Sequence, residues 1–298
     1  MIFFETCFWM AHRMTVKTEI RNSFDRHAAD YDHDAKLQRE IGLRLFDRLE
    51  YLKISPRYIL DLGCGTGFFS SLLKKKYRQA HIISLDFSMN MLLQAKNKQS
   101  WRHQWPLVHA DMIKMPFFDG VFDLIFANQT LHWDYPPTPV LRELNRVMNY
   151  QGCLMFSTLG PDTFKELVHA WSGVDGYTHT NQLMDMHHLG DALMGACFLD
   201  PVVDQEQLTG HYTSLNALLM SLKKQGERNI SPSRHLGLTG KQAYAQFSQV
   251  YDGLCTVEGK YPLTYEVVYG HAWKGVERSA LHGTEAFVPV NQIQRMRR

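Results

Sequence analysis

The chain has 298 residues, of which 45% are apolar and 21% are charged, and its formal net charge is +2. This is the composition of an ordinary soluble globular protein with one large α/β domain, or one domain plus an appendage. The near-neutral charge gives no support for a nucleic-acid binder. The five cysteines lie far apart without a CxxC pair. This spacing favours free thiols in the reducing cytoplasm over a disulfide framework or a zinc site.

The N-terminal segment, "MIFFETCFWMAHRM", is apolar but short. Its run of about ten apolar residues cannot span a bilayer. It also lacks the basic start and the small-residue cleavage site of a secretion signal. We therefore predict no membrane segment, and we expect residues 1–14 to be a disordered or non-native extension, with Met14 as the natural start. Residues 15–57 are predicted to form helices that close over a cofactor.

Short apolar runs alternate with helical patterns between residues 58 and 159. Strands are predicted at 57–63, 81–87, 107–111, 121–128 and 152–159, and helices from Phe68, after Ser88 as N-cap and over 139–148. This alternation predicts an α/β fold with a doubly wound, Rossmann-like and mostly parallel sheet covered on both faces.

The regular alternation of predicted strands and helices ends after residue 159. Helices are predicted over 161–175, 186–198, 214–226 and 241–252, an edge strand over 200–208 and a final antiparallel strand over 262–273. We therefore expect a helical substrate or lid region over 160–260. We expect two edge strands on the parallel core, the second of them lying in the segment 261–284, and a tail over 285–298.

The glycine-rich turn "DLGCGTG" at 61–67 joins the first core strand to the next helix. A phosphate-binding P-loop needs Lys and Ser or Thr after its last glycine, whereas Gly67 is followed by two phenylalanines. A dinucleotide turn requires GxGxxG, and this chain has GxGxG. Asp86, nineteen positions after Gly67, is placed to hold ribose hydroxyls. The turn alone leaves a dinucleotide site open.

Polar residues at the strand ends narrow the choice of ligand. Asp61 directly precedes the turn, where a carboxylate would repel a pyrophosphate but could hold an amine. Asp111 ends the third strand, where it could meet an adenine amino group, and Asn128 and Gln129 end the fourth. A ligand with an ammonium group, a ribose and an adenine but no phosphate fits all of them, and S-adenosylmethionine is such a ligand.

With these residues the chain resembles the class I S-adenosylmethionine-dependent methyltransferases. The resemblance implies that the glycines lie against the amino-acid part of the cofactor, Asp61 near its amino group and Asp86 at its ribose. It also implies that Asp111 and Met112 meet the adenine and that Asn128 faces the methionine chain. The full expected set is Tyr31, Asp61, Gly63, Cys64, Gly65, Gly67, Asp86, Phe87, Met91, Asp111, Met112, Asn128 and Gln129.

Several of these residues also have a simpler interpretation. The glycines can serve only a tight turn, and Asp86 can cap the helix that follows it. Asp111 can be a solvated loop acid, and Met91 can belong to the core.

Segments outside the core resemble one family, the malonyl-acyl-carrier-protein O-methyltransferases of biotin synthesis. Among them are "SFDRHAADYDHDAKLQ", "THTNQLMDMHHLGDAL" and "YPLTYEVVYGHAW", within a match over roughly 20–283. The resemblance implies methylation of the free carboxylate of a malonyl thioester. Because a carboxylate is already ionised near pH 7, no strong general base is needed, and alignment of the reactants is the main task. The expected pocket residues are Tyr31, His132, Trp133, His179 and Asn181.

The resemblance also implies an acidic acyl carrier protein as partner, which favours a basic docking surface. The expected patch comprises Lys223, Lys224, Arg228 and Arg234. No metal is expected, because the fifteen histidines lack carboxylate or cysteine partners at ligand spacing.

Three other functions remain open. One is a methyltransferase for a quinone precursor or another small molecule. A second is an arginine hydroxylase of respiratory complex I assembly, which "LHW" at 131–133 resembles. The third is a cofactor-binding scaffold without catalysis, against which the complete set of Asp61, Asp86, Asp111 and Asn128 argues.

Overall fold

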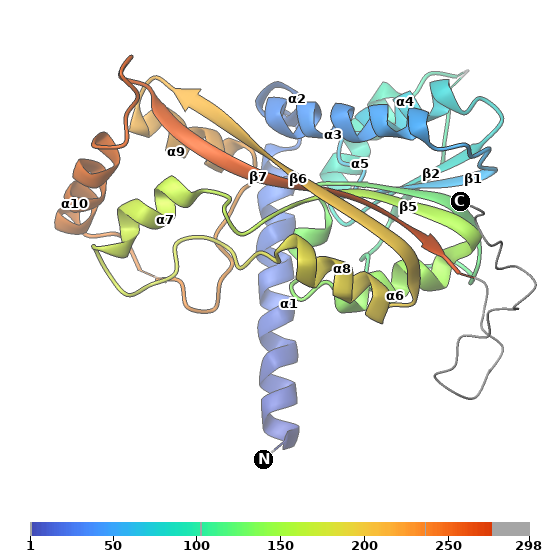
Figure 1. The fold of residues 1–298 in the computed structure, drawn as a ribbon, viewed down its shortest axis with the longest axis horizontal. Coiled ribbons are helices and arrows are strands. Elements are labelled where there is room, and N and C mark those ends of the chain that lie inside the picture. Colours follow the sequence, from blue (N-terminus) through green and yellow to red (C-terminus); the bar gives the residue numbers. More distant parts are fainter. Residues whose placement is uncertain (1, 102, 236, 276–298) are drawn as a thin grey trace, which may run out of the picture.

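Residues 2–101, 103–235 and 237–275 are described by the computed structural model, with side chains from Thr15 onward. They form a seven-stranded sheet in the order β3-β2-β1-β4-β5-β7-β6 (Figure 1). The strands are β1 Tyr58–Leu62, β2 His81–Asp86, β3 Leu107–His109, β4 Phe122–Asn128, β5 Met148–Leu159, β6 Phe198–Tyr212 and β7 Tyr261–Lys274. The pairings among β1 to β5 are parallel, and β7 is antiparallel to both β5 and β6. The predicted fold class is confirmed.

The helices lie close to the predicted ranges. They are α1 Ile2–His27, α2 Tyr31–Asp34, α3 Lys36–Arg48, α4 Phe68–Lys76, α5 Met89–Lys98, α6 Thr138–Val147, α7 Lys165–Ser172, α8 Met186–Gly195, α9 Leu215–Lys224 and α10 Lys241–Asp252, with the short 3-10 helices η1 Leu49–Tyr51 and η2 Leu131–Trp133. The Ser88 hydroxyl accepts a hydrogen bond from the backbone N–H of Met91, as predicted for the cap of α5.

Both faces of the sheet are covered because its strands send apolar side chains to either side. On β4, Leu124 and Phe126 belong to the core cluster that also contains Ile41 and Leu45 of α3. Ile125 and Ala127, which alternate with them along the strand, belong to the opposite cluster, with residues of α6 and α8. Figure 1 accordingly shows α3 and α4 on one side of the sheet and α6 and α8 on the other.

The expectation of two edge strands is wrong for the last strand. β7 lies between β5 and β6, and β6 alone takes the edge on that side. The reason lies in burial: residues 263–270 of β7 are all buried, which suits a strand with neighbours on both sides, whereas β6 alternates between exposed and half-buried positions.

The N-terminal segment and the C-terminal tail were both predicted to lie outside the folded core. The helix α1 begins at Ile2, so residues 2–14 of the expected extension have a helical backbone, and its description as disordered or non-native stays a prediction. The predicted tail 285–298 lies outside the described residues. Within the described ranges, no helix combines the length and the apolar character that a bilayer crossing needs.

The strands β6 and β7 extend beyond the core, where α7, α9 and α10 pack against them at the left of Figure 1. We call these three helices and the loops between them the lobe. Its centre is a stack of aromatic rings, in which Trp171 of α7 lies 4.4 Å from Phe247 of α10 between ring centroids.

Candidate functional site

The main cleft lies at the carboxyl ends of β1, β2 and β4 and is covered by α1 and α2. This is the position where open α/β sheets bind ligands. The cleft has a volume of about 740 Å³, counted with its open mouth. It is lined by Lys17, Ile20, Phe24, Tyr31, Leu62, Gly63, Gly65, Leu85, Asp86, Phe87, Met91, Ala110, Asp111, Met112, Asn128, Gln129, Thr130 and Trp133.

The glycine turn needs its glycines for different reasons. Gly63 has φ +65°, and a Cβ there would lie 2.3 Å from Thr130 Oγ1, so a side chain would meet both strain and a clash. The backbone N–H of Gly65 donates to Asp86 Oδ2 at 2.8 Å, inside the cleft. Gly67 lies outside the main cleft, where a Cβ would be 3.0 Å from that of Ala95. Gly67 therefore serves the packing of the turn against α5.

Asp86 is almost fully buried at the end of β2. Its carboxylate accepts hydrogen bonds from the backbone N–H groups of Gly65 and Ser88, each at 2.8 Å. Burial raises the pKa of Asp86 to about 6. Since a carboxylate has about four acceptor positions, Asp86 can still receive hydroxyl donors from a ligand in the cleft.

Asp61 lines a second cavity, here called the turn cavity, of about 530 Å³ with its mouth. Its Oδ2 accepts from the Ser70 hydroxyl at 2.5 Å, and the Ser84 hydroxyl donates to Ser70 at 2.7 Å. Burial raises the pKa of Asp61 to about 7. Cys64 also lines the turn cavity. The main cleft and the turn cavity adjoin, because they share five lining residues, namely Tyr31, Gly63, Gly65, Asn128 and Gln129.

Asp111 lies at the opposite end of the main cleft, beside Met112. Its two carboxylate oxygens lie 3.0 and 2.8 Å from Lys17 Nζ of α1. Lys17 is also 3.4 Å from Asp134 Oδ2. Neither Lys17 nor Asp134 was predicted from the sequence.

A cluster of aromatic side chains closes the cleft on the side of α1. The Phe24 ring lies 5.2 Å from Trp133 and 6.3 Å from both Tyr31 and Phe87, between centroids. Phe24 was missed from the sequence, although Lys17, Ile20 and Phe24 lie three and four residues apart, the spacing of one helical face.

Asn128 and Gln129 are held by contacts to neighbouring elements. The Asn128 amide donates to the carbonyl of Gln38 at 3.1 Å and accepts from the Ser157 hydroxyl at 2.8 Å. Gln129 has φ +53°, a left-handed conformation that is costly for a residue other than glycine and is often found at functional sites.

The predicted substrate residues fall into three places. Tyr31 and Trp133 line the main cleft. His132 lines a separate third cavity, described below. His179 and Asn181 lie at none of the three cavities.

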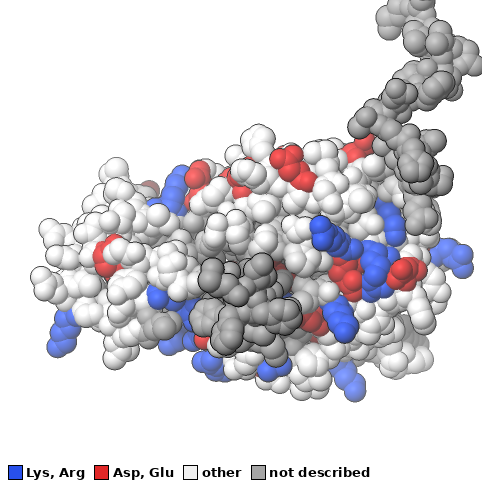
Figure 2. Space-filling view, turned by 90° about the horizontal axis from the view of Figure 1, so that it is seen from below, with Lys and Arg blue, Asp and Glu red and all other residues white. Residues whose placement is uncertain are grey.

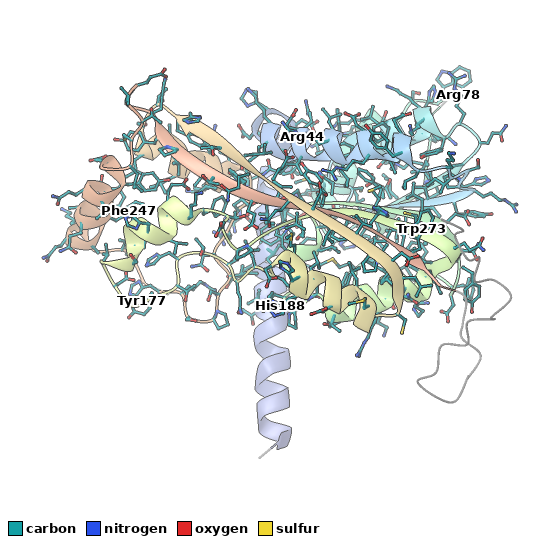
Figure 3. The ribbon with its side chains drawn as sticks, in the orientation of Figure 1. Arg44, Arg78, Tyr177, His188, Phe247 and Trp273 are labelled. Carbon is teal, nitrogen blue, oxygen red and sulfur yellow. The ribbon has the colours of Figure 1, made fainter. Side chains whose placement is uncertain are left out.

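The contacts of His179 and Asn181 explain this separation. His179 stacks on Trp171 at 3.9 Å and bonds to Asp175 at 2.8 Å, within the lobe whose Phe247 Figure 3 labels. The Asn181 amide bonds to the carbonyl of Arg228 and to the N–H of Ile230. Both side chains therefore order the lobe and its loops.

Two residues of the expected basic patch form ion pairs. Lys224 Nζ lies 3.8 Å from Asp34 of α2, and Arg234 lies 2.9 Å from Glu19 of α1. Among the described side chains, no group of three or more His, Cys, Asp or Glu is placed to bind a metal ion. Cys64, Cys153, Cys197 and Cys255 are free thiols.

Comparison with known proteins extends over nearly the whole chain. Residues 60–156 match the model of a methyltransferase domain. A malonyl-acyl-carrier-protein O-methyltransferase of Legionella pneumophila is 58% identical over 280 residues, which cover 94% of this chain and 99% of the relative. The enzymes of the same name from Laribacter hongkongensis and Gallionella capsiferriformans are 42% and 44% identical, over 89% and 88% of this chain and 91% and 92% of theirs.

Solved structures share the fold at low sequence identity. The YcgJ protein of Bacillus subtilis aligns with a TM-score of 0.55 at 14% identity, over 78% of this chain and 98% of that one. A SAM-dependent methyltransferase of Thermotoga maritima aligns with a TM-score of 0.50 at 16% identity, over 86% of this chain and 99% of that one. The fold and the relatives together show that this chain belongs to the malonyl-acyl-carrier-protein O-methyltransferases, a family of S-adenosylmethionine-dependent enzymes.

Proposed function

We propose that this protein transfers a methyl group from S-adenosylmethionine to the free carboxylate of malonyl-acyl-carrier protein and so primes biotin synthesis. The names of its relatives favour this substrate over a quinone precursor and over arginine hydroxylation. The observation that carries the proposal is that three carboxylates, Asp61, Asp86 and Asp111, line two adjoining cavities.

The carboxylates fit the proposed methyl donor group by group. Asp61 suits the ammonium group, Asp86 the ribose hydroxyls and Asp111 the adenine amino group, whereas a phosphate beside Asp61 or Asp86 would be repelled. When bound, S-adenosylmethionine supplies an electrophilic methyl group on a positive sulfur.

The residues of this chain then have a positioning task. The malonyl carboxylate is ionised near pH 7 and attacks without a general base. Tyr31, Phe24 and Trp133 form an apolar cover that excludes water, and Asn128 is fixed by Ser157 and Gln38 at the junction of the two cavities. Alignment and exclusion of water account for the catalysis that we propose.

The acidic carrier is proposed to dock at the end of α9. Lys223 and Lys224 are exposed there, and the contact of Lys224 with Asp34 places them beside α2, which carries Tyr31 of the cleft. Arg228 follows in the next loop and is exposed, whereas Arg234 is occupied by Glu19. On the face shown in Figure 2, coloured basic and acidic residues are intermixed. That face does not single out a docking surface, so the docking proposal is based on Lys223 and Lys224 at the end of α9.

The test is a methylation assay with purified protein, S-adenosylmethionine and malonyl-carrier protein. We expect a product heavier by one methyl group that is lost on ester hydrolysis, and we expect the gene to rescue a biotin auxotroph. Methylation of a quinol precursor, with none of the malonyl thioester, would contradict the proposal. We propose the cytoplasm as the location, in agreement with the free thiols.

A further inference from the structure

A third cavity, here called the η2 cavity, lies on the other side of η2 from the main cleft. Its volume is about 300 Å³ with its mouth. Six of its eleven lining residues are apolar. It is lined by Leu131, His132, Asp134, Tyr135, Pro137, Thr158, Leu159, Gln182, Leu183, Met184 and Leu189.

The His132 imidazole is the unusual group in this cavity. Both ring nitrogens are buried, and neither hydrogen-bonds to any residue that the structure describes. Burial lowers the pKa of His132 to about 3, so the ring is neutral, with one N–H donor and one acceptor. Buried polar groups in folded proteins nearly always have a partner, and an exception calls for an explanation such as a ligand.

The η2 cavity and the main cleft share a wall. Along η2, Thr130 and Trp133 face the main cleft, whereas Leu131, His132 and Asp134 face the η2 cavity. Asp134 lies 3.4 Å from Lys17, which lines the main cleft. The residues of η2 therefore separate the two cavities.

The rim of the η2 cavity is linked to the proposed docking surface. The Gln182 amide donates to the Tyr135 hydroxyl at 3.0 Å, and both residues are exposed. Asn181, next to Gln182, donates to the carbonyl of Arg228 at 2.8 Å. The rim therefore lies beside the loop that carries Arg228.

We propose that the η2 cavity binds the neutral thioester end of the acyl arm, and that the His132 N–H donates a hydrogen bond to its carbonyl oxygen. This assignment rests on the proposed function. The apolar walls and the Asp134 carboxylate disfavour an anion, so the cavity suits the neutral part of the substrate and not the malonyl carboxylate. His132 is then a substrate-binding residue that aligns the arm. Carrier protein and coenzyme A present the same thioester chemistry.

The experiment compares His132→Leu with the parent protein on malonyl-carrier protein and on malonyl-coenzyme A. We expect kcat/KM to fall about 10- to 100-fold on both thioesters, as for a lost hydrogen bond to substrate. The Kd of S-adenosylmethionine should stay unchanged. The melting temperature should not fall, because leucine removes a polar group without a partner. His169→Leu, an exposed histidine on α7, is the matched control and should leave all three values unchanged.

Several results would overturn the assignment. Unchanged kcat/KM in His132→Leu would make His132 an ordinary buried histidine. If S-adenosylmethionine binding weakened by the same factor, His132 would act on the cofactor and not on the thioester. If kcat/KM fell on malonyl-carrier protein alone, His132 would act on carrier docking. If His132→Leu does not fold, Gln182→Leu at the exposed rim decides: we expect a severalfold higher KM on both thioesters, and no change would overturn the proposal. A parent protein inactive on both thioesters, yet binding S-adenosylmethionine, would refute the proposed function itself.

Discussion

The ammonium of Lys17 lies 2.8 and 3.0 Å from the two carboxylate oxygens of Asp111, although 94 positions separate them in the sequence. This ion pair ties α1 to the end of the main cleft where we place the adenine. A second tie lies farther along the helix, where Asp25 accepts from the Ser88 hydroxyl at 2.6 Å and from the Asn90 backbone N–H at 3.2 Å. The helix α1 is therefore held across the cleft as a cover.

Replacement of Lys17 by Met should loosen this cover. A partly exposed ion pair contributes about 0.5–1 kcal/mol, so we expect S-adenosylmethionine to dissociate about 2- to 5-fold faster. Stopped-flow displacement measures this rate. Lys96→Met, an exposed lysine in the last turn of α5, is the control and should leave the rate unchanged. Equal rates in Lys17→Met and the parent would show that the pair does not hold the cover.

Replacement of Asp86 by Ala should weaken S-adenosylmethionine binding by about 1–3 kcal/mol, the usual loss for hydrogen bonds to a charged group. This corresponds to roughly 5- to 150-fold in Kd, which calorimetry measures. An unchanged Kd would contradict the ribose-binding role.

The same carboxylate should make binding depend on pH. The pKa of Asp86 in the folded free protein is about 6, above the usual 3.8, so ionisation is disfavoured in the fold and this group destabilises the free protein as pH rises from about 4 to 6. Ribose hydroxyls need the ionised acceptor. Affinity should therefore fall as pH drops below about 6, by up to tenfold per unit. Calorimetry from pH 5 to 8 measures the trend. Asp86→Asn should remove the part of the fall that begins below about pH 6 and leave the part caused by Asp61, whose pKa is about 7. Identical pH profiles in Asp86→Asn and the parent would argue against this cause.

Replacement of Gly63 by Ala should disrupt the turn. The positive φ and the approach of Thr130 together should cost about 1–3 kcal/mol of unfolding free energy and weaken cofactor binding. Gly176→Ala is the matched control, because its φ is not in the left-handed region and a Cβ there meets nothing within 4 Å. Thermal melts and calorimetry on both variants test this difference, and similar melts would contradict it.

Replacement of both Lys223 and Lys224 by Glu should weaken binding of the carrier protein and leave the rate of methyl transfer unchanged. We expect KM for malonyl-carrier protein to rise severalfold, with a steeper response at low salt, because complementary charges steer association. KM for a small malonyl thioester should change little. Equal effects on the two substrates would refute the docking surface.

Replacement of His179 by Ala separates an ordering role from a substrate role. The ring stacks on Trp171 and bonds to Asp175, so its loss should lower the melting temperature of the protein. The Kd of S-adenosylmethionine and kcat for malonyl thioester should stay within about twofold at a temperature where the variant is folded. A large loss of kcat without loss of stability would support the substrate contact that the sequence predicted for His179.

The sequence by itself determined the parallel core and the acids of the site. Asp61, Asp86 and Asp111 each stand at or just beyond the end of an apolar run, and the carboxyl ends of parallel strands meet at one edge of the sheet. A local pattern was therefore enough to bring together residues that are distant along the chain.

Only the tertiary structure decided what covers those acids. Lys17 and Phe24 lie on an otherwise ordinary helix, and their partners Asp111 and Trp133 follow about a hundred residues later. The interior position of β7 depends on β6 as its neighbour, and the place of His179 depends on the stack with Trp171 and Phe247. Periodicity fixes which face of an element is buried, but not which element packs against that face. That choice is made when the whole chain packs.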